Sequence, residues 1–159
     1  MTASTPFDEL YQRPGFLLRR AHQISVAIFE RECAAVGLTP AQYGVLYTLS
    51  HAPDIGQSAL SRALGLDRVT VLHVAKGLEK RGLIVRKSGI DGKRRLALAL
   101  TAEGDRAFRM AQECAERALQ ALVSPFTEGE AQTLNALLNK LCATLESEAR
   151  TEMSPPAKS

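Results

Sequence analysis

Apolar residues recur at helical spacing along most of the chain, and glycine or proline marks the points where this spacing breaks. A first long helix is expected from Pro14 to Gly37, because proline suits a first turn and the apolar positions keep a helical period. Thr39 and Gln42 form a capping-box pattern that starts a second helix. That helix should end near His51.

Two further helices follow, separated by a tight turn. The first spans Gln57 to Leu64 and should end at Gly65, since glycine readily adopts the left-handed conformation of a helix C-terminus. Asp67 is the expected N-cap of the next helix, which runs to Arg81. Two helices in this arrangement, the second capped and basic, are typical of a DNA-binding helix-turn-helix.

The period changes to that of strands between residues 83 and 100. Residues 83–87 and 96–100 are the expected strands, and the second alternates leucine with alanine, as a strand with one buried face does. The segment 88–95 is rich in glycine and positive charge. A β-hairpin with a basic tip is therefore expected here.

The last third of the chain predicts two long helices. Thr101 should cap a helix over residues 102–123, and a second capping box at Thr127 and Glu130 should start a helix that runs to about Arg150. Residues 151–159 are expected to be a disordered tail. The predicted fold class is mainly α with a small β-hairpin wing, a winged helix-turn-helix joined to a helical dimerisation region.

Composition favours a cytoplasmic helical protein. The 159 residues suit one compact domain or two small interleaved ones, and 45% hydrophobic residues with 5% aromatic and no Trp predict a core of Leu, Ala and Val. The chain shows neither an apolar run of membrane-spanning length nor the start of a secretory signal. Three well-separated cysteines indicate neither a disulfide framework nor a metal site.

Charge is distributed unevenly, although the whole chain carries only +3. Residues 57–95 contain ten Lys or Arg against three acids, a net charge of +7, which leaves −4 for the remainder. A basic segment within an acidic remainder is the electrostatic pattern expected of a nucleic-acid site. The alternative is a solvated, lysine-rich helix face.

Helical spacing divides the helix after Asp67 into two faces. Val71, Val74, Ala75 and Leu78 belong to the core, whereas the other face is expected to contact DNA. Leu72 either touches a thymine methyl group or closes the rim of the core. The DNA-binding candidates on the two helices are Ser58, Arg68, Val69, Thr70, His73 and Lys76.

The hairpin tip is expected to enter the minor groove, where the potential of DNA is most negative. Lys93, Arg94 and Arg95 are the candidates for this contact, and Asp91 is the candidate brace for one of the arginines. The alternative is an ordinary solvated turn.

Four segments together resemble the MarR family of bacterial transcriptional regulators. They are residues 38–46 (LTPAQYGVL), 57–71 (QSALSRALGLDRVTV), 78–84 (LEKRGLI) and 98–104 (LALTAEG), and the resemblance runs from about Pro14 to Leu145. It implies a homodimer whose terminal helices interlock, two winged units that bind one double-stranded DNA, and repression relieved by a small ligand. The implied DNA target is a pseudo-palindromic operator.

The chain departs from the family pattern at three positions. Gly92 occupies the place of the usual wing aspartate, with Asp91 one residue earlier, so either the turn is one residue longer or Asp91 braces Arg95. His73 stands where an arginine is common, and Gly77 lowers helix propensity by roughly 1 kcal/mol against alanine. The base preference of the family is therefore not carried over.

The domains expected on this basis are four in number. Residues 1–38 form the N-terminal helical part of the dimerisation region, 39–101 the winged helix-turn-helix DNA-binding domain, 102–150 the C-terminal dimerisation helices, and 151–159 the tail. A stripe of leucines in the C-terminal helices supports a homodimer, although an intrachain core is the alternative use for it. Its members are Leu119, Leu122, Leu134, Leu137, Leu138, Leu141 and Leu145.

A ligand site is expected next to the first long helix. Residues 14–23 are similar to family members that respond to aromatic acids or their coenzyme A thioesters. Arginine and histidine there suit a carboxylate or phosphate, and nearby aromatic residues suit an apolar cavity. The alternative is that the arginines form surface or interface ion pairs. The candidates are Phe16, Arg19, Arg20, His22, Phe29, Tyr43 and Tyr47.

A redox switch, an enzyme and a winged domain for protein contacts are the alternative functions. A redox switch would use Cys33, Cys114 or Cys142, but each is expected to be a buried, inert thiol. An enzyme is not expected, and neither is a cofactor or metal, because no phosphate loop, metal-ligand cluster or nucleophile elbow is present. A winged domain used only for protein contacts is disfavoured by the cations on both helix and wing.

Overall fold

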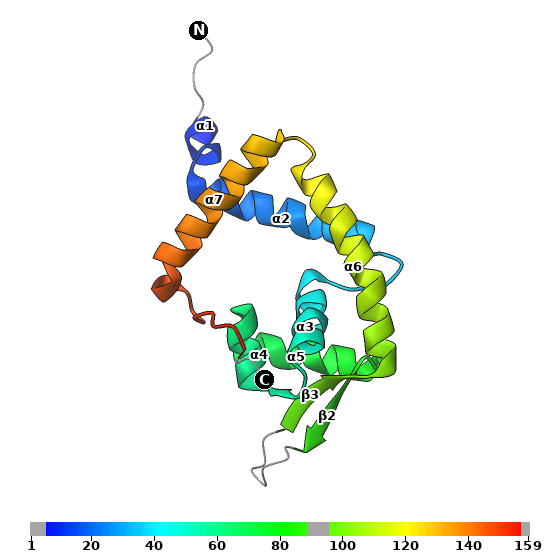
Figure 1. Cartoon of the computed structure of the whole chain (residues 1–159). Helices are drawn as coiled ribbons and strands as arrows, with labels where there is room; N and C mark the ends of the chain where they lie inside the picture. Colours follow the sequence, from blue (N-terminus) through cyan, green and yellow to red (C-terminus); the bar gives the residue numbers. More distant parts are fainter. Residues whose placement is uncertain (1–5, 89–95, 157–159) are drawn as a thin grey trace.

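The computed structural model describes residues 6–88 and 96–156 and shows a winged unit joined to a group of longer helices (Figure 1). The helices α2 and α7 occupy one half of the molecule, α3, α4, α5 and the sheet occupy the other, and α6 runs from one half to the other. The elements are α1 (Pro6–Tyr11), α2 (Pro14–Glu32), α3 (Pro40–His51), β1 (Ile55–Gly56), α4 (Gln57–Leu64), α5 (Arg68–Lys80), β2 (Ile84–Ser88), β3 (Leu96–Leu100), α6 (Ala102–Val123), α7 (Glu128–Thr144) and the 3-10 helix η1 (Glu146–Glu148).

Side-chain caps start the helices at the predicted positions. Thr39 and Thr127 each form a complete capping box, with the hydroxyl accepting from the third amide of the helix. Asp67 and Thr101 cap α5 and α6 in the same way. Gly65 ends α4 in the left-handed conformation, with φ of 62°. These local signals confirm the predicted starts of four helices.

One additional helix and two helix ends differ from the sequence-based expectation. A short helix, α1, precedes α2. The helix α2 ends at Glu32 rather than Gly37, and the loop after it is bound by Arg81, which donates to the carbonyls of Val36 and Gly37 at 2.8 and 2.7 Å. The helix α7 ends at Thr144 rather than near Arg150. Hydrogen bonds to distant residues help to decide where such helices end, and the helical period of the sequence does not reveal those bonds.

The predicted hairpin is present and has a third strand beside it. The sheet is antiparallel with the order β1-β3-β2, and Arg86 of β2 lies opposite Leu98 of β3. The strand β1 pairs Ile55 with Leu98 on the other edge. With only two residues, β1 is too short to show an alternating pattern in the sequence.

The core is built mainly from leucine, valine and alanine, as composition predicts. It joins α3, α4, α5, the sheet and the first half of α6. Phe108 of α6 is the aromatic member of the buried cluster and is 5% exposed. Its largest wholly buried members include Leu46, Leu60, Leu78 and Leu98.

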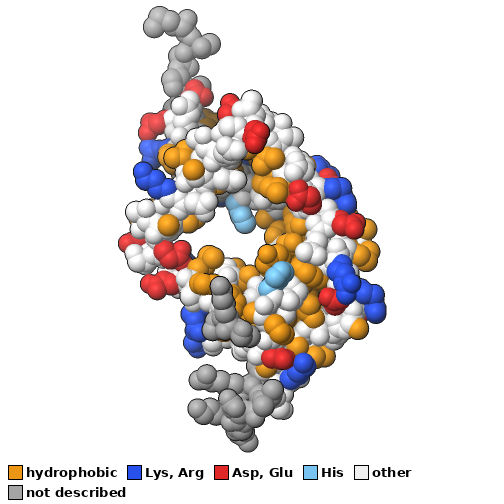
Figure 2. All heavy atoms as spheres, in the orientation of Figure 1, with side chains coloured by type: hydrophobic (Ala, Val, Ile, Leu, Met, Phe, Trp, Pro, Cys, Tyr) orange, Lys and Arg blue, Asp and Glu red, His pale blue; other side chains and the backbone are white. Residues whose placement is uncertain are grey.

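The helix α6 connects the winged unit to α2 (Figure 1). Its second half packs against α2 near the buried side chains of Cys33 and Cys114. By contrast, α2 and α7 contain no buried residue in the single chain. Figure 2 shows an opening between these helices and the winged unit, bordered by hydrophobic side chains.

The segment after α7 does not extend away from the fold. Residues 151–156 run back to α4, where the Ser154 amide donates to the Arg62 carbonyl at 3.0 Å. Residues 151–156 of the expected tail therefore lie against the fold, and residues 157–159 lie outside the described residues. Within the described ranges, no helix is both long and apolar enough to cross a membrane.

We expect Gly104→Ala to destabilise the fold severely. A Cβ at Gly104 would lie 1.8 Å from the carbonyl oxygen of Leu83, which accepts from the Thr101 amide at the start of α6. Backbone on both sides prevents relief of the clash, so thermal or urea unfolding should show a loss of about 3 kcal/mol or more.

The matched control is Gly77→Ala in α5. A Cβ there meets only the Gln42 side chain, at an ordinary 3.8 Å. This variant should gain up to roughly 1 kcal/mol from helix propensity. Equal stability of the two variants would contradict the packing of α6 on the Leu83 carbonyl.

Candidate nucleic-acid interface

The helix α5 is buried on one face and open on the other. Val71, Ala75 and Leu78 are 0% exposed and pack into the core, and Val74 packs partly against it. These positions are the ones that helical spacing assigns to the core, so the two-faced prediction for this helix is confirmed. The opposite side is available to a partner.

The outer face of α5 consists of the exposed residues Arg68, Val69, His73 and Lys76. Val69 is 76% exposed, which is unusual for an apolar side chain in the first turn of a well-packed helix. The side chains of the three polar members make no hydrogen bond or ion pair with another described residue. An exposed apolar group between unpartnered cationic and polar side chains suits base edges and phosphates in a major groove.

Thr70 differs from its neighbours because its polar groups are already bonded. Its hydroxyl donates to Asp67 Oδ2 at 2.6 Å, and its amide donates to Oδ1 at 2.9 Å. These bonds, the hydroxyl first, hold the pKa of the Asp67 carboxyl below its usual range. Thr70 therefore positions the start of α5, and its methyl group and hydroxyl lone pairs are what it can offer DNA.

The first helix of the pair is bonded to the second at the same end. Gln57 Nε2 donates to the Arg68 carbonyl at 3.3 Å, and Ser58, in the first turn of α4, is exposed. Leu72 is half-buried, which is compatible with the rim of the core. The exposed candidates from α4 and α5 thus lie around the start of α5.

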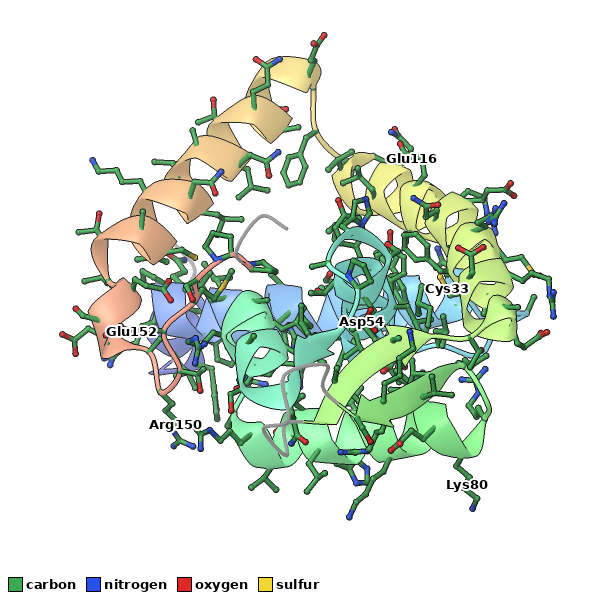
Figure 3. All side chains as sticks on the ribbon, turned by 60° about the horizontal axis from the view of Figure 1, so that its bottom comes forward. Cys33, Asp54, Lys80, Glu116, Arg150 and Glu152 are labelled. Atoms are coloured by element: carbon green, nitrogen blue, oxygen red, sulfur yellow. The ribbon has the colours of Figure 1, made fainter. Side chains whose placement is uncertain are left out.

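Three of the basic residues counted in the sequence are used inside the fold. Arg81 donates to the loop after α2, Arg86 pairs with Glu79 at 2.8 Å, and Lys87 pairs with Asp54 at 3.1 Å. The Arg86–Glu79 pair is only about one quarter exposed and joins β2 to α5. Lys80 points away from the fold at the end of α5 (Figure 3). The net charge of this segment does not distinguish cations that bond to the rest of the fold from cations that face solvent.

The base of the wing is therefore bonded to α5 through the Arg86–Glu79 pair, and to the loop between α3 and β1 through the Lys87–Asp54 pair. The predicted tip residues Lys93, Arg94 and Arg95, together with the brace candidate Asp91, lie outside the described residues. Their contact with the minor groove remains a prediction.

The ligand candidates fall into two groups, one where α2 meets α3 and one on the first half of α2. Phe29, Tyr43 and Tyr47 belong to one aromatic cluster, with ring centroids 5.5 Å apart for Phe29–Tyr43 and 6.1 Å for Tyr43–Tyr47. Phe108 and His51 complete the cluster. His51 follows Tyr43 and Tyr47 at four-residue intervals, a signal visible in the sequence, whereas Phe108 comes from a helix far along the chain.

The second group lies on the exposed first half of α2. The Arg19 guanidinium lies 4.8 Å from the centroid of the Phe16 ring, and Arg19 and Arg20 each donate to Gln23. His22 is exposed on the same segment. Thirteen residues of helix separate Phe16 from Phe29, about 20 Å at the usual rise per residue. One chain therefore does not bring the two groups into a single cavity.

A groove of about 830 Å³ lies beside the aromatic cluster, between α3, α4 and the segment after η1. His51 Nδ1 lies 2.8 Å from the Tyr47 carbonyl, which accepts, so the neutral ring would have its proton on Nδ1 and a free acceptor at Nε2. The groove is lined by Tyr43, Gly44, Tyr47, Thr48, His51, Ala52, Ala63, Leu64, Met153, Pro155 and Pro156.

The cysteines are placed differently from one another. Cys33 and Cys114 are buried where α2 meets α6, and the Arg117 guanidinium donates to the Cys114 sulfur at 3.3 Å. Burial, with Cys114 nearby, raises the pKa of the Cys33 thiol to about 11. The expectation of burial was wrong for Cys142, which is exposed on α7, a helix that contains no buried residue in the single chain.

A model of the MarR family matches residues 36–95, which include α3, α4, α5 and β2. A putative transcriptional regulatory protein for the hcr operon of Thauera aromatica is 34% identical over 128 residues, covering 80% of this chain and 77% of that protein. Both similarities include the outer face of α5.

Solved structures share the fold over nearly the whole chain. The transcriptional repressor CouR bound to a 23-mer DNA duplex has a TM-score of 0.79 and 28% identity, over 88% of this chain and 99% of that one. BpsR of Bordetella bronchiseptica, whose DNA binding is regulated by 6-hydroxynicotinic acid, has a TM-score of 0.78 and 27% identity, over 87% and 97%.

We expect Lys76→Ala and His73→Ala to weaken DNA binding in different ways. Loss of a phosphate contact at Lys76 should lower affinity alike for all sequences and reduce the slope of log affinity against log salt by about 1. Loss of a base contact at His73 should instead change the ranking of operator variants, by roughly 1–3 kcal/mol at one base pair.

Fluorescence anisotropy with operator DNA selected from a random library measures both effects. Lys140→Ala is the matched control, because Lys140 is exposed on α7, in the other half of the molecule. Unchanged affinity, salt slope and ranking in both α5 variants would exclude the outer face of α5 as the DNA contact.

Proposed function

The chain belongs to the MarR family of DNA-binding transcription regulators, which are not enzymes, and we propose that it is a homodimeric repressor released by a small aromatic acid or acyl-CoA-like ligand. The observation that carries the proposal is the outer face of α5, open and unpartnered on a helix whose inner face is wholly buried. Its operator is a pseudo-palindromic DNA duplex, which it binds in the cytoplasm.

DNA binding follows from the geometry of α5 and the wing. The N-terminal end of α5 enters the major groove, where Arg68 and Val69 meet base edges and Lys76 meets a phosphate. The wing follows the backbone, and Lys93 to Arg95 enter the adjacent minor groove. The CouR structure, which contains duplex DNA, supports this use of the shared fold.

A homodimer is proposed because the single chain leaves a large apolar surface open. Leu137 on α7 is 60% exposed and Leu145, directly after α7, is 50% exposed. On α1 and α2, Phe7 is 61% and Leu17 51% exposed. Monomers rarely expose contiguous apolar areas of this kind. Residues 1–38 and 102–150 form the dimerisation region in this proposal, and residues 39–101 form the DNA-binding domain.

We expect light scattering to give twice the 17.2 kDa chain mass, and Leu137→Glu to shift the protein toward monomer. A charge placed in an apolar interface is costly because it loses hydration without a partner. Ala136→Glu is the matched control, since it adds the same charge on the opposite side of α7. A wild-type protein that is strictly monomeric at micromolar concentration would refute the dimer.

The ligand is proposed to occupy the groove beside the aromatic cluster. Tyr47 and His51 offer rings for stacking, and His51 Nε2 offers a polar contact to a hydroxyl or carboxyl group. Along α2, Phe16 lies about 20 Å and His22 about 10 Å from Phe29, and neither they nor Arg19 and Arg20 line the groove. They contribute to the same ligand only if a second copy supplies them.

Ligand binding releases DNA if it favours an arrangement in which the two α5 helices no longer match successive major grooves. BpsR is regulated by 6-hydroxynicotinic acid, which supports an aromatic acid as the ligand class here. The rival redox switch is disfavoured by the burial of Cys33 and Cys114 and by the raised pKa of the Cys33 thiol.

We expect at least one aromatic acid or its coenzyme A thioester to release the operator in a gel-shift titration. The panel comprises benzoate, salicylate, 4-hydroxybenzoate, 6-hydroxynicotinate and benzoyl-CoA. His51→Ala should weaken release while leaving operator affinity without ligand unchanged, because His51 lies in the groove and not on α5.

Hydrogen peroxide is the control for the rival function, and it should leave operator binding intact. Release by peroxide but by none of the panel would replace the ligand proposal with a redox switch.

A further inference from the structure

The chain closes one side of its own groove with residues 151–156. After η1, this segment turns back from the end of α7 and reaches α4 (Figure 1). One backbone amide bonds it to α4, with Ser154 donating to the Arg62 carbonyl at 3.0 Å. The Met153 amide donates instead to Glu146 Oε1 of η1, at 2.6 Å, and so holds the turn itself. Figure 3 shows Arg150 and Glu152 on either side of the turn.

The Met153 side chain packs on Gly65, the residue that ends α4. A Cβ at Gly65 would lie 2.7 Å from Met153 Cγ and 3.1 Å from its sulfur, so the methionine occupies the space that the missing side chain leaves. Gly65 also has a φ of 62°, which other residues rarely adopt. The contact at the start of the segment is thus specific to these two residues.

The end of the segment lines the groove. Pro155 and Pro156 border it together with Met153, opposite Tyr43, Tyr47 and His51 of α3. Two successive prolines restrict the backbone, so the segment loses little conformational entropy when it takes one position. A stiff apolar wall facing an aromatic wall suits a flat ring between them.

We propose that residues 151–156 form a strap that completes the ligand site and connects α7 to α4. This rests on the proposed ligand-responsive function. The strap joins the end of α7, in the proposed dimerisation region, to the first helix of the helix-turn-helix. A ring that enters the groove contacts the strap on one side and α3 on the other, so binding is coupled to the position of α4 relative to α7.

Two truncated chains test the strap. One ends at Arg150 and lacks it, and the matched control ends at Pro156 and lacks only residues 157–159. The chain contains no Trp and three Tyr, two of which line the groove, so tyrosine fluorescence reports on the site without a label. Acrylamide should quench this fluorescence more strongly in the Arg150 chain, and equally in the control and the full chain.

Hydrogen exchange of the full chain tests docking directly. The amide of Ser154 should exchange more slowly than that of Glu152, because only the former donates to a carbonyl of α4. Met153→Ser should abolish the difference, and Met153→Leu should restore it by refilling the space beside Gly65. Equal, rapid exchange of both amides in the full chain would overturn docking of the strap.

Ligand affinity tests the role of the strap in the site. The panel acids, with 6-hydroxynicotinate first, should bind the Arg150 chain roughly 10-fold more weakly than the Pro156 chain, because one apolar wall is lost. Operator affinity without acid should agree within about 3-fold. Equal acid affinity in the two chains would overturn the strap as part of the ligand site.

The two proposals fail in different ways. If no panel acid binds the full chain, the proposed ligand class is refuted, and with it the role of the strap in binding that class. Exchange at Ser154 and quenching of tyrosine fluorescence still decide whether the strap docks and covers the groove. If acids bind and release DNA equally with and without residues 151–156, the function stands and the strap is refuted.

Discussion

Burial of the inner face of α5 is the constraint on which the DNA-contacting surface depends. Val71, Ala75 and Leu78 have no solvent exposure and contact residues of α3, α4 and the sheet. Burying side chains as large as valine or leucine contributes about 1.5–3 kcal/mol each, so α5 does not rotate about its axis without a large loss of stability. The exposed positions of Val69 and His73 follow directly from this packing.

Polar bonds at both ends of α5 complete its placement. At the N-terminal end, Asp67 caps the helix and Gln57 donates to the Arg68 carbonyl. At the C-terminal end, Arg81 donates to the loop after α2, and Glu79 pairs with Arg86 of the wing. These bonds connect α5 to the loop after α2 and to the wing.

The proposed ligand site lies at the border between the two halves of the molecule. The winged unit has its own core, whereas α2 and α7 bury no side chain completely in the single chain. The aromatic cluster, the groove and residues 151–156 all lie at this border. In the proposed function, a ligand in the groove contacts the winged unit and the segment after α7 at once, which is the condition for coupling its binding to the spacing of the two α5 helices of the proposed dimer.

The sequence by itself determined where four of the helices start and which face of α5 is buried, because caps and helical periods are local properties. Thr39, Asp67, Thr101 and Thr127 each start a helix where their spacing predicts it. The position of Val69 on the outer face follows from the same spacing.

Only the tertiary structure decided which polar and aromatic residues meet. Arg81 and Gly37 lie 44 residues apart, Tyr43 meets Phe108 across helices, and Ser154 reaches Arg62 from the far end of the chain. Such partners depend on how packed elements cross in space. The helical period of the sequence does not show how the elements cross. In the net charge of residues 57–95, Arg81 therefore counts in the same way as a cation that contacts DNA.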